Sequence, residues 1–465
     1  MNLDTVIAAN RFGLGARPGE LGKIDGKHVP WLKNQLNGPP RLPAVFSDLA
    51  KTPQILQDVQ TVRAMRREAR QSPDDAPAPD VVREYTAVVR RHYIDQTAAR
   101  YVNAAQTDYP FHERLVHFWT NHFAVSADKQ PVTALAGAFE NEAIRPNLTG
   151  SFYKLLLAVE KHPAMIVYLD NQQSIGPNSQ VGQRANRRRT DRSIGLNENL
   201  AREILELHTL GVDGGYDQED VTSFAKVITG WSVGGGERRM FREGVPGTFE
   251  FRENIHEPGT QRIMGSSYSQ DDVRQGEAVL RGLAAHPSTA RHLAGKLLRH
   301  FVADDPPQRA VERLAHVFLE SDGDLPTVHA ALVDTEDAWR SATAKYKSTQ
   351  DFVISAFRAF DRTPDDPRFI IGALDLMGQT PYRPGSPAGW PDTADEWGGA
   401  DALYKRIEWS NTVARHAGGR ADPVALGDAV LGPALSDHTR NAIARAESAT
   451  QGITLLLASP DFQRR

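Results

Sequence analysis

Two histidines and one glutamate are the residues of this sequence best suited to chemistry. His122 lies in the aromatic segment 118–123, and Glu203 and His208 lie in the segment 197–212. Two imidazoles and one carboxylate can hold zinc or non-haem iron with coordination positions left open. Without a metal, the same groups can act as general acids and bases. We therefore expect a catalytic site at His122, Glu203 and His208, with a divalent metal on these residues as one option.

The expected site depends on two helices that face each other. On the first helix, His122 shares a face with aromatic residues and points into the core, whereas His117 points to nearly the opposite side. On the second helix, Glu203 and His208 flank an apolar stripe, and a carboxylate at the edge of a core needs a partner. His208 follows Glu203 by five positions, about 140° around an α-helix, so the two cannot share one metal unless the helix bends.

A purely structural interpretation of these residues stays open. In it, His122 and His208 are core histidines that are bonded to backbone carbonyl groups. Glu203 would then pair with an arginine and lock two helices together, since structural ion pairs outnumber catalytic ones.

Further candidates for ligand binding adjoin the expected site or lie in polar and aromatic motifs: Asn121, Arg202, Trp231, His256 and Trp390. Asn121 and Arg202 are sequence neighbours of the expected site and are expected to support it. Trp390 belongs to a strap rich in proline, glycine and aromatic residues, at 379–397. Such a strap can stack on a sugar or an extended peptide, or it can pack on the helices beneath it.

Helices must position these residues. Pro110 suits the first turn of a helix, and apolar residues recur at helical spacing from there onward. A second helix is predicted from Asn197, as its N-cap, to Gly211, as its terminating glycine. Asp217, with Asp220 three residues later, predicts the N-cap of a third helix. The second and third helices are expected to form an αα-hairpin.

The chain as a whole predicts a mainly α, multi-helical, lobed architecture with a small β-hairpin insertion. Long charged helices are expected over 53–105, interrupted by a polar loop at 71–80. Residues 248–252 alternate like a strand, with 262–264 as the expected partner. The arginine-rich residues 170–193 lack periodicity and predict a loop that covers the site. The expected regions are 1–105, 106–283 and 284–465.

The composition excludes several classes of protein. The 465 residues include no cysteine, so disulfides, thiolate metal sites and thiol nucleophiles are excluded. The formal net charge of −4 gives no positive field that would attract nucleic acid. No apolar run approaches the roughly 20 residues of a membrane span. The first residues lack a secretory signal, so the chain as written is expected in the cytoplasm, with a periplasmic or exported location as the alternative.

Several motifs point to a known family. They are Phe-Trp-Thr-Asn-His-Phe at 118–123, the segment 197–212, Ile-Thr-Gly-Trp at 228–231, His-Glu-Pro-Gly at 256–259 and Ser-Pro-Ala-Gly-Trp-Pro at 386–391. Through them the chain resembles, over nearly its whole length, the bacterial family called domain of unknown function 1800. The resemblance implies a large, mostly helical protein, often exported beside a partner protein of another uncharacterised family. Glu257 and Gln261 depart from it, because the resemblance leads us to expect Asp and Lys there.

Two functions of different classes follow from these features. The first is an enzyme, either a hydrolase or a metal-dependent oxidoreductase, with a pocket beneath residues 170–193 and convergent polar groups in it. The second is a binding or assembly protein that acts on a partner protein or an extracellular polymer. It would show an exposed apolar or basic patch and no polar pocket. The sequence does not identify the substrate, whether a small molecule or a polymer.

Overall fold

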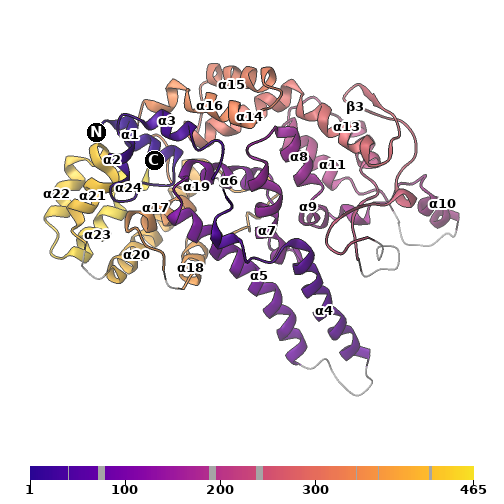
Figure 1. Ribbon diagram of the computed structural model, residues 1–465, viewed down its shortest axis with the longest axis horizontal. Coiled ribbons are helices and arrows are strands. Elements are labelled where there is room, and N and C mark those ends of the chain that lie inside the picture. Colours follow the sequence, from indigo (N-terminus) through magenta and orange to yellow (C-terminus); the bar gives the residue numbers. More distant parts are fainter. Residues whose placement is uncertain are drawn as a thin grey trace.

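The computed structural model describes residues 1–39, 41–71, 79–187, 195–236, 244–341, 343–364, 366–417 and 421–465. Within these ranges the chain is mainly helical, and its strands form two antiparallel sheets of two strands each. The predicted mainly α class with a small β insertion is therefore confirmed. Figure 1 shows an elongated body from which one pair of helices projects. Each helix in the described ranges is too short or too polar to cross a lipid bilayer.

The helices of the body pack around a continuous apolar core whose members run from Val6 to Phe462. The first part of the body contains α1 (Leu3–Ile7), α2 (Glu20–Ile24), α3 (His28–Lys33), α6 (Pro110–His122), α7 (Val132–Phe139), α8 (Phe152–Glu160) and α9 (Pro163–Tyr168). The later part contains α13 (Asp272–Ala284), α14 (Pro287–Phe301), α15 (Gln308–Glu320), α16 (Leu325–Val333), α17 (Thr349–Ala359), α18 (Arg368–Leu376), α19 (Ala394–Trp397), α20 (Ala400–His416), α21 (Pro423–Leu431), α22 (Asp437–Ala444), α23 (Ala449–Ala458) and α24 (Pro460–Gln463).

The two ends of the described chain lie close together on one side of the body (Figure 1). There α2 packs against α21. Arg358 of α17 donates two hydrogen bonds to the carboxylate of Glu20, at 3.1 and 3.0 Å, although 338 positions separate the two residues. Arg465 donates to the carbonyl oxygen of Arg11 at 3.3 Å. Buried polar contacts therefore join the first and last segments.

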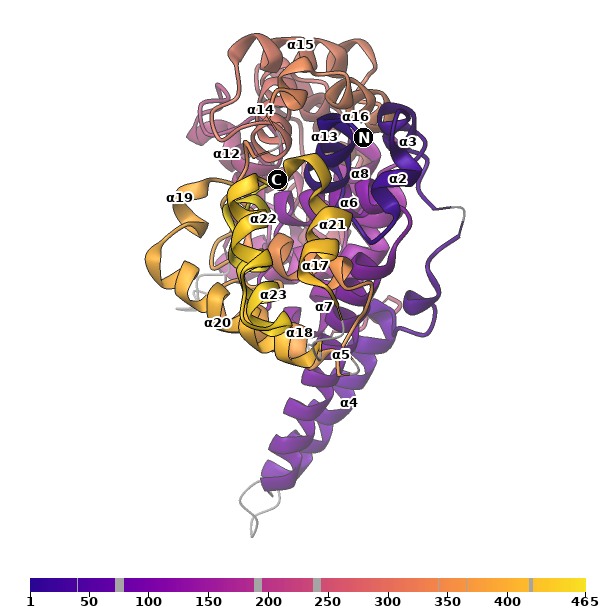
Figure 2. The same cartoon turned by 90° about the vertical axis from the view of Figure 1, so that its left-hand side faces the viewer.

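The projecting pair consists of α4 (Thr52–Gln71) and α5 (Pro79–Gln106), which pack along each other. Both views show the pair extending away from the body (Figure 1, Figure 2). The predicted charged helices over 53–105 are confirmed. The loop predicted at 71–80 falls mostly on residues 72–78, which lie outside the described ranges.

Helix α6 runs through the middle of the body, with Pro110 in its first turn as predicted. The rings of Phe118 and His300 lie 5.3 Å apart, which places α14 against one side of α6. On another side, Gln350 of α17 lies 3.1 Å from His117. The side of α6 that carries His117, predicted to lie nearly opposite His122, is therefore also covered, and His117 is 5% exposed.

The helix predicted over 197–211 begins as α11 (Asn199–Glu203) and continues as the π-helix η6 (Ile204–Thr209). The predicted N-cap at Asn197 is wrong by one position, because the N-cap is Glu198, whose side chain makes no capping hydrogen bond. Asn197, just before it, accepts a hydrogen bond from the backbone N–H of Asn199 at 3.0 Å. The change to a π-helix was not predicted. In a π-helix each backbone bond spans five residues, which brings residues five positions apart, such as Glu203 and His208, close to the same side.

Helix α12 (Gln218–Val227) follows and packs against α11, which confirms the predicted αα-hairpin. Asp217 and Asp220 form a reciprocal capping box at its start, as the sequence predicts.

Replacing Asp217 with Ala is expected to lower the free energy of unfolding by about 1 kcal/mol, because the N–H group of Asp220 loses its acceptor. Urea unfolding monitored by circular dichroism measures the change. Glu219→Ala, two positions later, changes an exposed residue outside the capping box and serves as the matched control. Equal losses in the two variants would contradict a capping role for Asp217.

The small sheets differ from the predicted pairing. Strand β2 (Phe249–Phe251) pairs with β1 (Trp231–Val233), and β3 (Gln261–Ile263) pairs with β4 (Ser266–Tyr268). The prediction that 262–264 pairs with 248–252 is wrong, because a turn at Met264 and Gly265, both with positive φ, folds β3 back onto β4.

The loop predicted at 170–193 is only partly irregular. It contains the short 3₁₀ turn η5 (Asn171–Gln173) and the helix α10 (Gln180–Arg187). Asn178 donates two hydrogen bonds to the buried carboxylate of Glu257, at 2.8 and 2.6 Å, which fixes the chain just before α10. The prediction of a loop is therefore wrong at 180–187, where the chain forms a helix. The arginines at 188, 189 and 192 lie outside the described ranges.

Candidate functional site

The structure brings two of the three predicted catalytic residues together. The rings of His122 and His208 lie 6.3 Å apart, and both side chains are buried. The Nε2–H group of His122 donates to the backbone carbonyl oxygen of His208 at 3.2 Å. This contact is the one that the structural interpretation of the sequence anticipates for a core histidine.

The carboxylate partner of His208 is Glu160 rather than Glu203. His208 Nδ1 lies 2.8 Å from Glu160 Oε1, and both groups are buried between α8 and η6. Glu203 is half-buried and makes no hydrogen bond to another described residue. Burial raises the pKa of its carboxyl group, and the nearby His208 only partly opposes this effect. Glu203 therefore borders the histidine cluster without joining it.

A metal at these residues receives no support. Among the described residues, no group of three histidine, aspartate or glutamate side chains is arranged to hold an ion. His292 adds a third imidazole, 6.2 Å from His122, and its Nε2–H donates to the carbonyl oxygen of Leu207. Burial lowers the pKa of His122 well below its usual range and that of His292 to about 4, so these rings are neutral at pH 7.

Three of the predicted binding residues are buried or bonded to other parts of the protein. Trp231 is buried in β1. His256 donates through Nδ1 to the carbonyl oxygen of Thr229 at 2.8 Å. Arg202 pairs with Glu198 at 3.2 Å, one helical turn away. None of the three lines the pocket described next.

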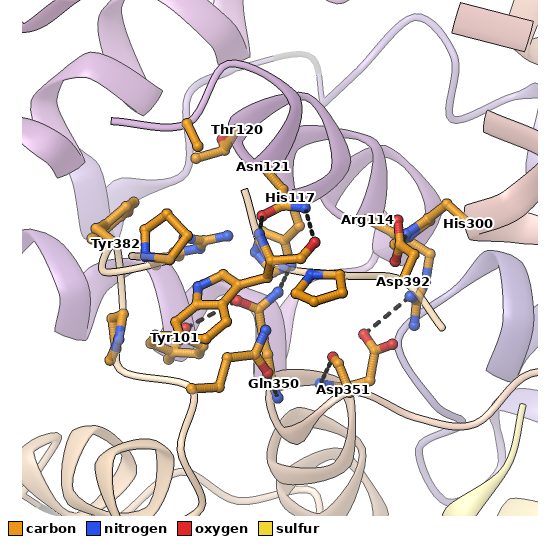
Figure 3. Close-up of a pocket in the computed structure, with 18 of the residues that line it drawn as sticks. Tyr101, Arg114, His117, Thr120, Asn121, His300, Gln350, Asp351, Tyr382 and Asp392 are labelled. Carbon is orange, nitrogen blue, oxygen red and sulfur yellow. Dashed lines mark hydrogen bonds and ion pairs between the residues drawn. The ribbon is translucent and has the colours of Figure 1, made fainter. Parts of the chain in front are cut away.

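That pocket lies where α5, α6, α14 and α17 meet beneath the strap at 379–397, and it encloses a cavity of about 60 Å³. The predicted binding residues Asn121 and Trp390 line it. No residue of 170–193, beneath which the sequence placed the expected pocket, lines this one. Figure 3 shows Arg114, His300 and Asp392 together at one end of the pocket and Tyr382 toward the other.

His300 and Asp392 form a histidine–carboxylate pair in the pocket wall. His300 Nδ1–H donates to Asp392 Oδ1 at 2.7 Å, while Nε2 is buried without a hydrogen-bond partner in the described part of the chain. Burial lowers the pKa of His300, although Asp392 acts in the opposite direction. Burial acts to raise the pKa of Asp392, but His300, Arg465 and Lys345 outweigh it and lower that pKa to about 2. The pair is therefore a neutral imidazole oriented by an ionised carboxylate.

Beside this pair, two arginines hold a second carboxylate. Arg114 Nη1 lies 3.0 Å from Asp351 Oδ1, and Arg465 Nε lies 3.0 Å from Asp351 Oδ2. Burial acts to raise the pKa of Asp351, but the two guanidinium groups outweigh it and hold that pKa well below its usual range. The Asp351 carboxylate thus keeps the guanidinium of Arg114 in a fixed position at the pocket wall.

A chain of hydrogen bonds forms the opposite wall. Tyr101 donates to Gln350 Oε1 at 3.0 Å, and Gln350 Nε2 donates to His117 Nδ1 at 3.1 Å. Because His117 Nδ1 accepts, the ring proton lies on Nε2, which faces Glu113 at 3.5 Å. Arg100 covers the ring of Tyr382 at 4.9 Å. These contacts hold the wall rigid.

Sequence reasoning missed most of this pocket. His300 lies outside the motifs quoted above, whereas Asp392 directly follows the motif at 386–391. A polar, titratable residue at the border of a distinctive motif was the available signal. His300 and Asp392 lie 92 positions apart, so no local sequence pattern indicates that they pair.

Comparison with known proteins gives one match. A family model described as "Protein of unknown function (DUF1800)" matches residues 7–464. No curated protein and no solved structure matches the chain.

Proposed function

The chain belongs to the DUF1800 family, and we propose that it is an enzyme that performs hydrolysis by acid–base chemistry in the pocket beneath the strap. The observation that carries the proposal is the hydrogen bond of 2.7 Å from His300 to Asp392. A carboxylate on Nδ1 fixes the tautomer of an imidazole and leaves Nε2 as the basic atom. This Nε2 is buried, has no hydrogen-bond partner among the described groups and belongs to a residue that lines the pocket.

The chemistry follows from that tautomer. His300 Nε2 takes a proton from a water molecule, and the resulting hydroxide adds to the electrophilic carbon or phosphorus atom of the substrate. The imidazolium then returns the proton to the leaving oxygen as its bond to that atom breaks, so neutral imidazole is restored. Asp392 stabilises the imidazolium between the two steps.

The pocket favours a small substrate rich in oxygen. Arg114 lies at the same end of the pocket as His300 and Asp392 (Figure 3). A guanidinium held at that place stabilises negative charge that develops on a carbonyl or phosphoryl oxygen. The carboxylates of Asp351 and Asp392 already face cationic or hydrogen-bond-donating partners, which makes a cationic substrate the poorer fit.

The alternative proposal, a binding or assembly protein, is less well supported. Such a protein was expected to lack a pocket with convergent polar groups. A pocket lined by His117, His300, Asp351 and Asp392 supports the catalytic proposal instead.

Substitution of His300 by Asn tests the proposal with p-nitrophenyl acetate and p-nitrophenyl phosphate as probes. We expect the wild-type protein to hydrolyse at least one probe, and His300→Asn to lower kcat/KM by at least about 100-fold, the usual contribution of a general base. Asp392→Asn is expected to cause a loss of similar size, because the ring then loses its fixed tautomer. Release of p-nitrophenol, followed by absorbance, gives the rates.

His316→Asn is the matched control, because His316 is an exposed histidine on α15 that pairs with the exposed Glu320. It should retain wild-type rates, and thermal unfolding should show that all the variants are folded. A wild-type protein that hydrolyses neither probe, or a folded His300→Asn variant with wild-type rates, would overturn the proposed function.

A further inference from the structure

We infer that Asn121 is a positioning residue for the His300–Asp392 pair, because its side chain clamps the strap that carries Asp392. The inference rests on the proposed function for its catalytic meaning, but the geometry that it concerns can be measured separately. Asn121 lies near the end of α6, and Asp392 lies in the strap more than two hundred and fifty positions later.

The clamp consists of two hydrogen bonds to one residue. Asn121 Nδ2 donates to the carbonyl oxygen of Trp390 at 2.8 Å, and the backbone N–H of Trp390 donates to Asn121 Oδ1 at 2.7 Å. Figure 3 draws dashed lines at Asn121, close to His117. An amide side chain is suited to this role, because it offers one donor and one acceptor in the same plane.

The strap passes so close to α6 that the preceding residue has no room for a side chain. Gly389 has a φ of +83°, and a Cβ atom there would lie 2.2 Å from the backbone oxygen of Asn121. Glycine is the residue that adopts this φ without strain. The backbone conformation at Gly389 therefore places Trp390 within hydrogen-bond distance of Asn121.

Between positions 384 and 391, the strap depends on this clamp. Among the described residues, no other hydrogen bond joins this stretch to the helices beneath it. Trp397 donates to the carbonyl oxygen of Pro391 at 2.9 Å, but it belongs to the same strap. Without Asn121, the backbone that leads to Asp392 would lose its direct attachment to α6.

The clamp also sets the distance from Asp392 to His300. Asp392 is two residues after Trp390, so its backbone can lie at most about 7 Å from the clamped residue. Phe118, one turn before Asn121 on the same helix, packs against the ring of His300 at 5.3 Å. Helix α6 therefore holds both members of the pair. On the far side, Lys345 Nζ donates to the carbonyl oxygen of Asp392 at 2.5 Å.

The test uses the ring N–H proton of His300, which is shared with a carboxylate and should give a far-downfield proton resonance. Protein labelled with ¹⁵N-histidine allows this resonance to be observed, and its loss in His300→Asn and Asp392→Asn assigns it. We expect Asn121→Ala to abolish or broaden the resonance while the thermal unfolding temperature stays within a few degrees of the wild type. Turnover of the probe should fall about 100-fold, the loss that follows from a misplacement of about 1 Å.

Asn197→Ala is the matched control. Asn197 also uses its amide to donate to a backbone oxygen, that of Leu169, and to accept a backbone N–H, each at 3.0 Å, but it lies away from the pocket. This variant should keep the resonance. Asn121→Asp retains the acceptor for the N–H of Trp390 and loses the donor, so it should give a weaker effect than Asn121→Ala.

A second route covers the case in which Asn121→Ala unfolds. Gly389→Ala displaces the strap from its own side and leaves α6 unchanged, and it should also remove the resonance. A resonance that persists unchanged in either folded variant, or that is absent from the wild type, would overturn the inference. If the resonance behaves as expected but no probe is hydrolysed, the positioning role stands and the proposed function fails.

Discussion

The free energy of unfolding is expected to fall by at least about 6 kcal/mol when the pH is lowered from about 7.5 to about 5, with about 2 kcal/mol from each of His112, His292 and His329. Burial lowers the pKa of His112 and of His292 to about 4 and that of His329 to about 3, and it lowers the pKa of His122 in the same direction. In the unfolded chain these imidazoles have a pKa of about 6.5.

The sign of the effect follows from these shifts. Below about pH 6.5 the unfolded chain takes up protons that the folded chain does not accept, so protonation favours unfolding. The contribution of each histidine to the free energy of unfolding is fully present above its pKa in the unfolded chain. It is lost as the pH falls below that value toward the pKa in the folded chain. His329 shows the structural reason, because its Nε2 accepts the indole N–H of Trp119 at 3.2 Å and cannot do so once protonated.

Urea unfolding at constant ionic strength, at several pH values between these limits, measures the loss. His329→Gln keeps an acceptor for the Trp119 indole but does not titrate, so it should reduce the pH dependence by about 2 kcal/mol. His316→Gln changes an exposed histidine and should leave the pH dependence as it is. A midpoint of unfolding that is unchanged between the two limits would contradict the expectation.

Replacing Arg145 with Met is expected to lower the free energy of unfolding by about 3–5 kcal/mol, because it strands buried carboxylates. Arg145 binds both oxygens of Glu113, at 2.5 and 2.9 Å, and lies 3.4 Å from Glu140. All three side chains are buried. After the substitution, Arg100, 3.4 Å from Glu140, is the one guanidinium among the described residues that still pairs with either carboxylate.

Chemical denaturation at neutral pH measures this loss as well. The matched control is Arg440→Met, because Arg440 also binds both oxygens of one carboxylate, that of Asp428, but at the surface. Exposed pairs contribute about 0–1 kcal/mol, so this control should be nearly as stable as the wild type. Similar losses in the two variants would show that burial of the network is not the cause.

The sequence predicted helix starts well, because the signals for a helix start come from a few neighbouring residues. Pro110 marked the start of α6, and Asp217 with Asp220 marked the start of α12. The burial of His117 was not predicted, for a reason that periodicity cannot detect. Helical periodicity assigns a buried and an exposed face on the assumption that water covers one side, whereas α6 has packed helices on both sides.

The candidate site was predictable only in part. The proximity of His122 and His208 followed from the inward face of each helix. The partner of His208 did not, because Glu160 comes from α8, 48 positions earlier, and no local pattern marks it. The strand pairing was wrong for a similar reason. Strand β2 has two possible partners at comparable distance in the sequence, β1 and β3, and the tight turn at 264–265 pairs β3 with β4 instead.

The closeness of the chain's first and last described segments has a consequence for synthesis on the ribosome. Glu20 emerges early but meets Arg358 only after a further 338 residues have been made, and Asp351 meets Arg465 later still. Until then, the first helices of the nascent chain keep part of their apolar surface exposed. Translation therefore leaves a long interval in which chaperones and proteases compete for the unfinished chain.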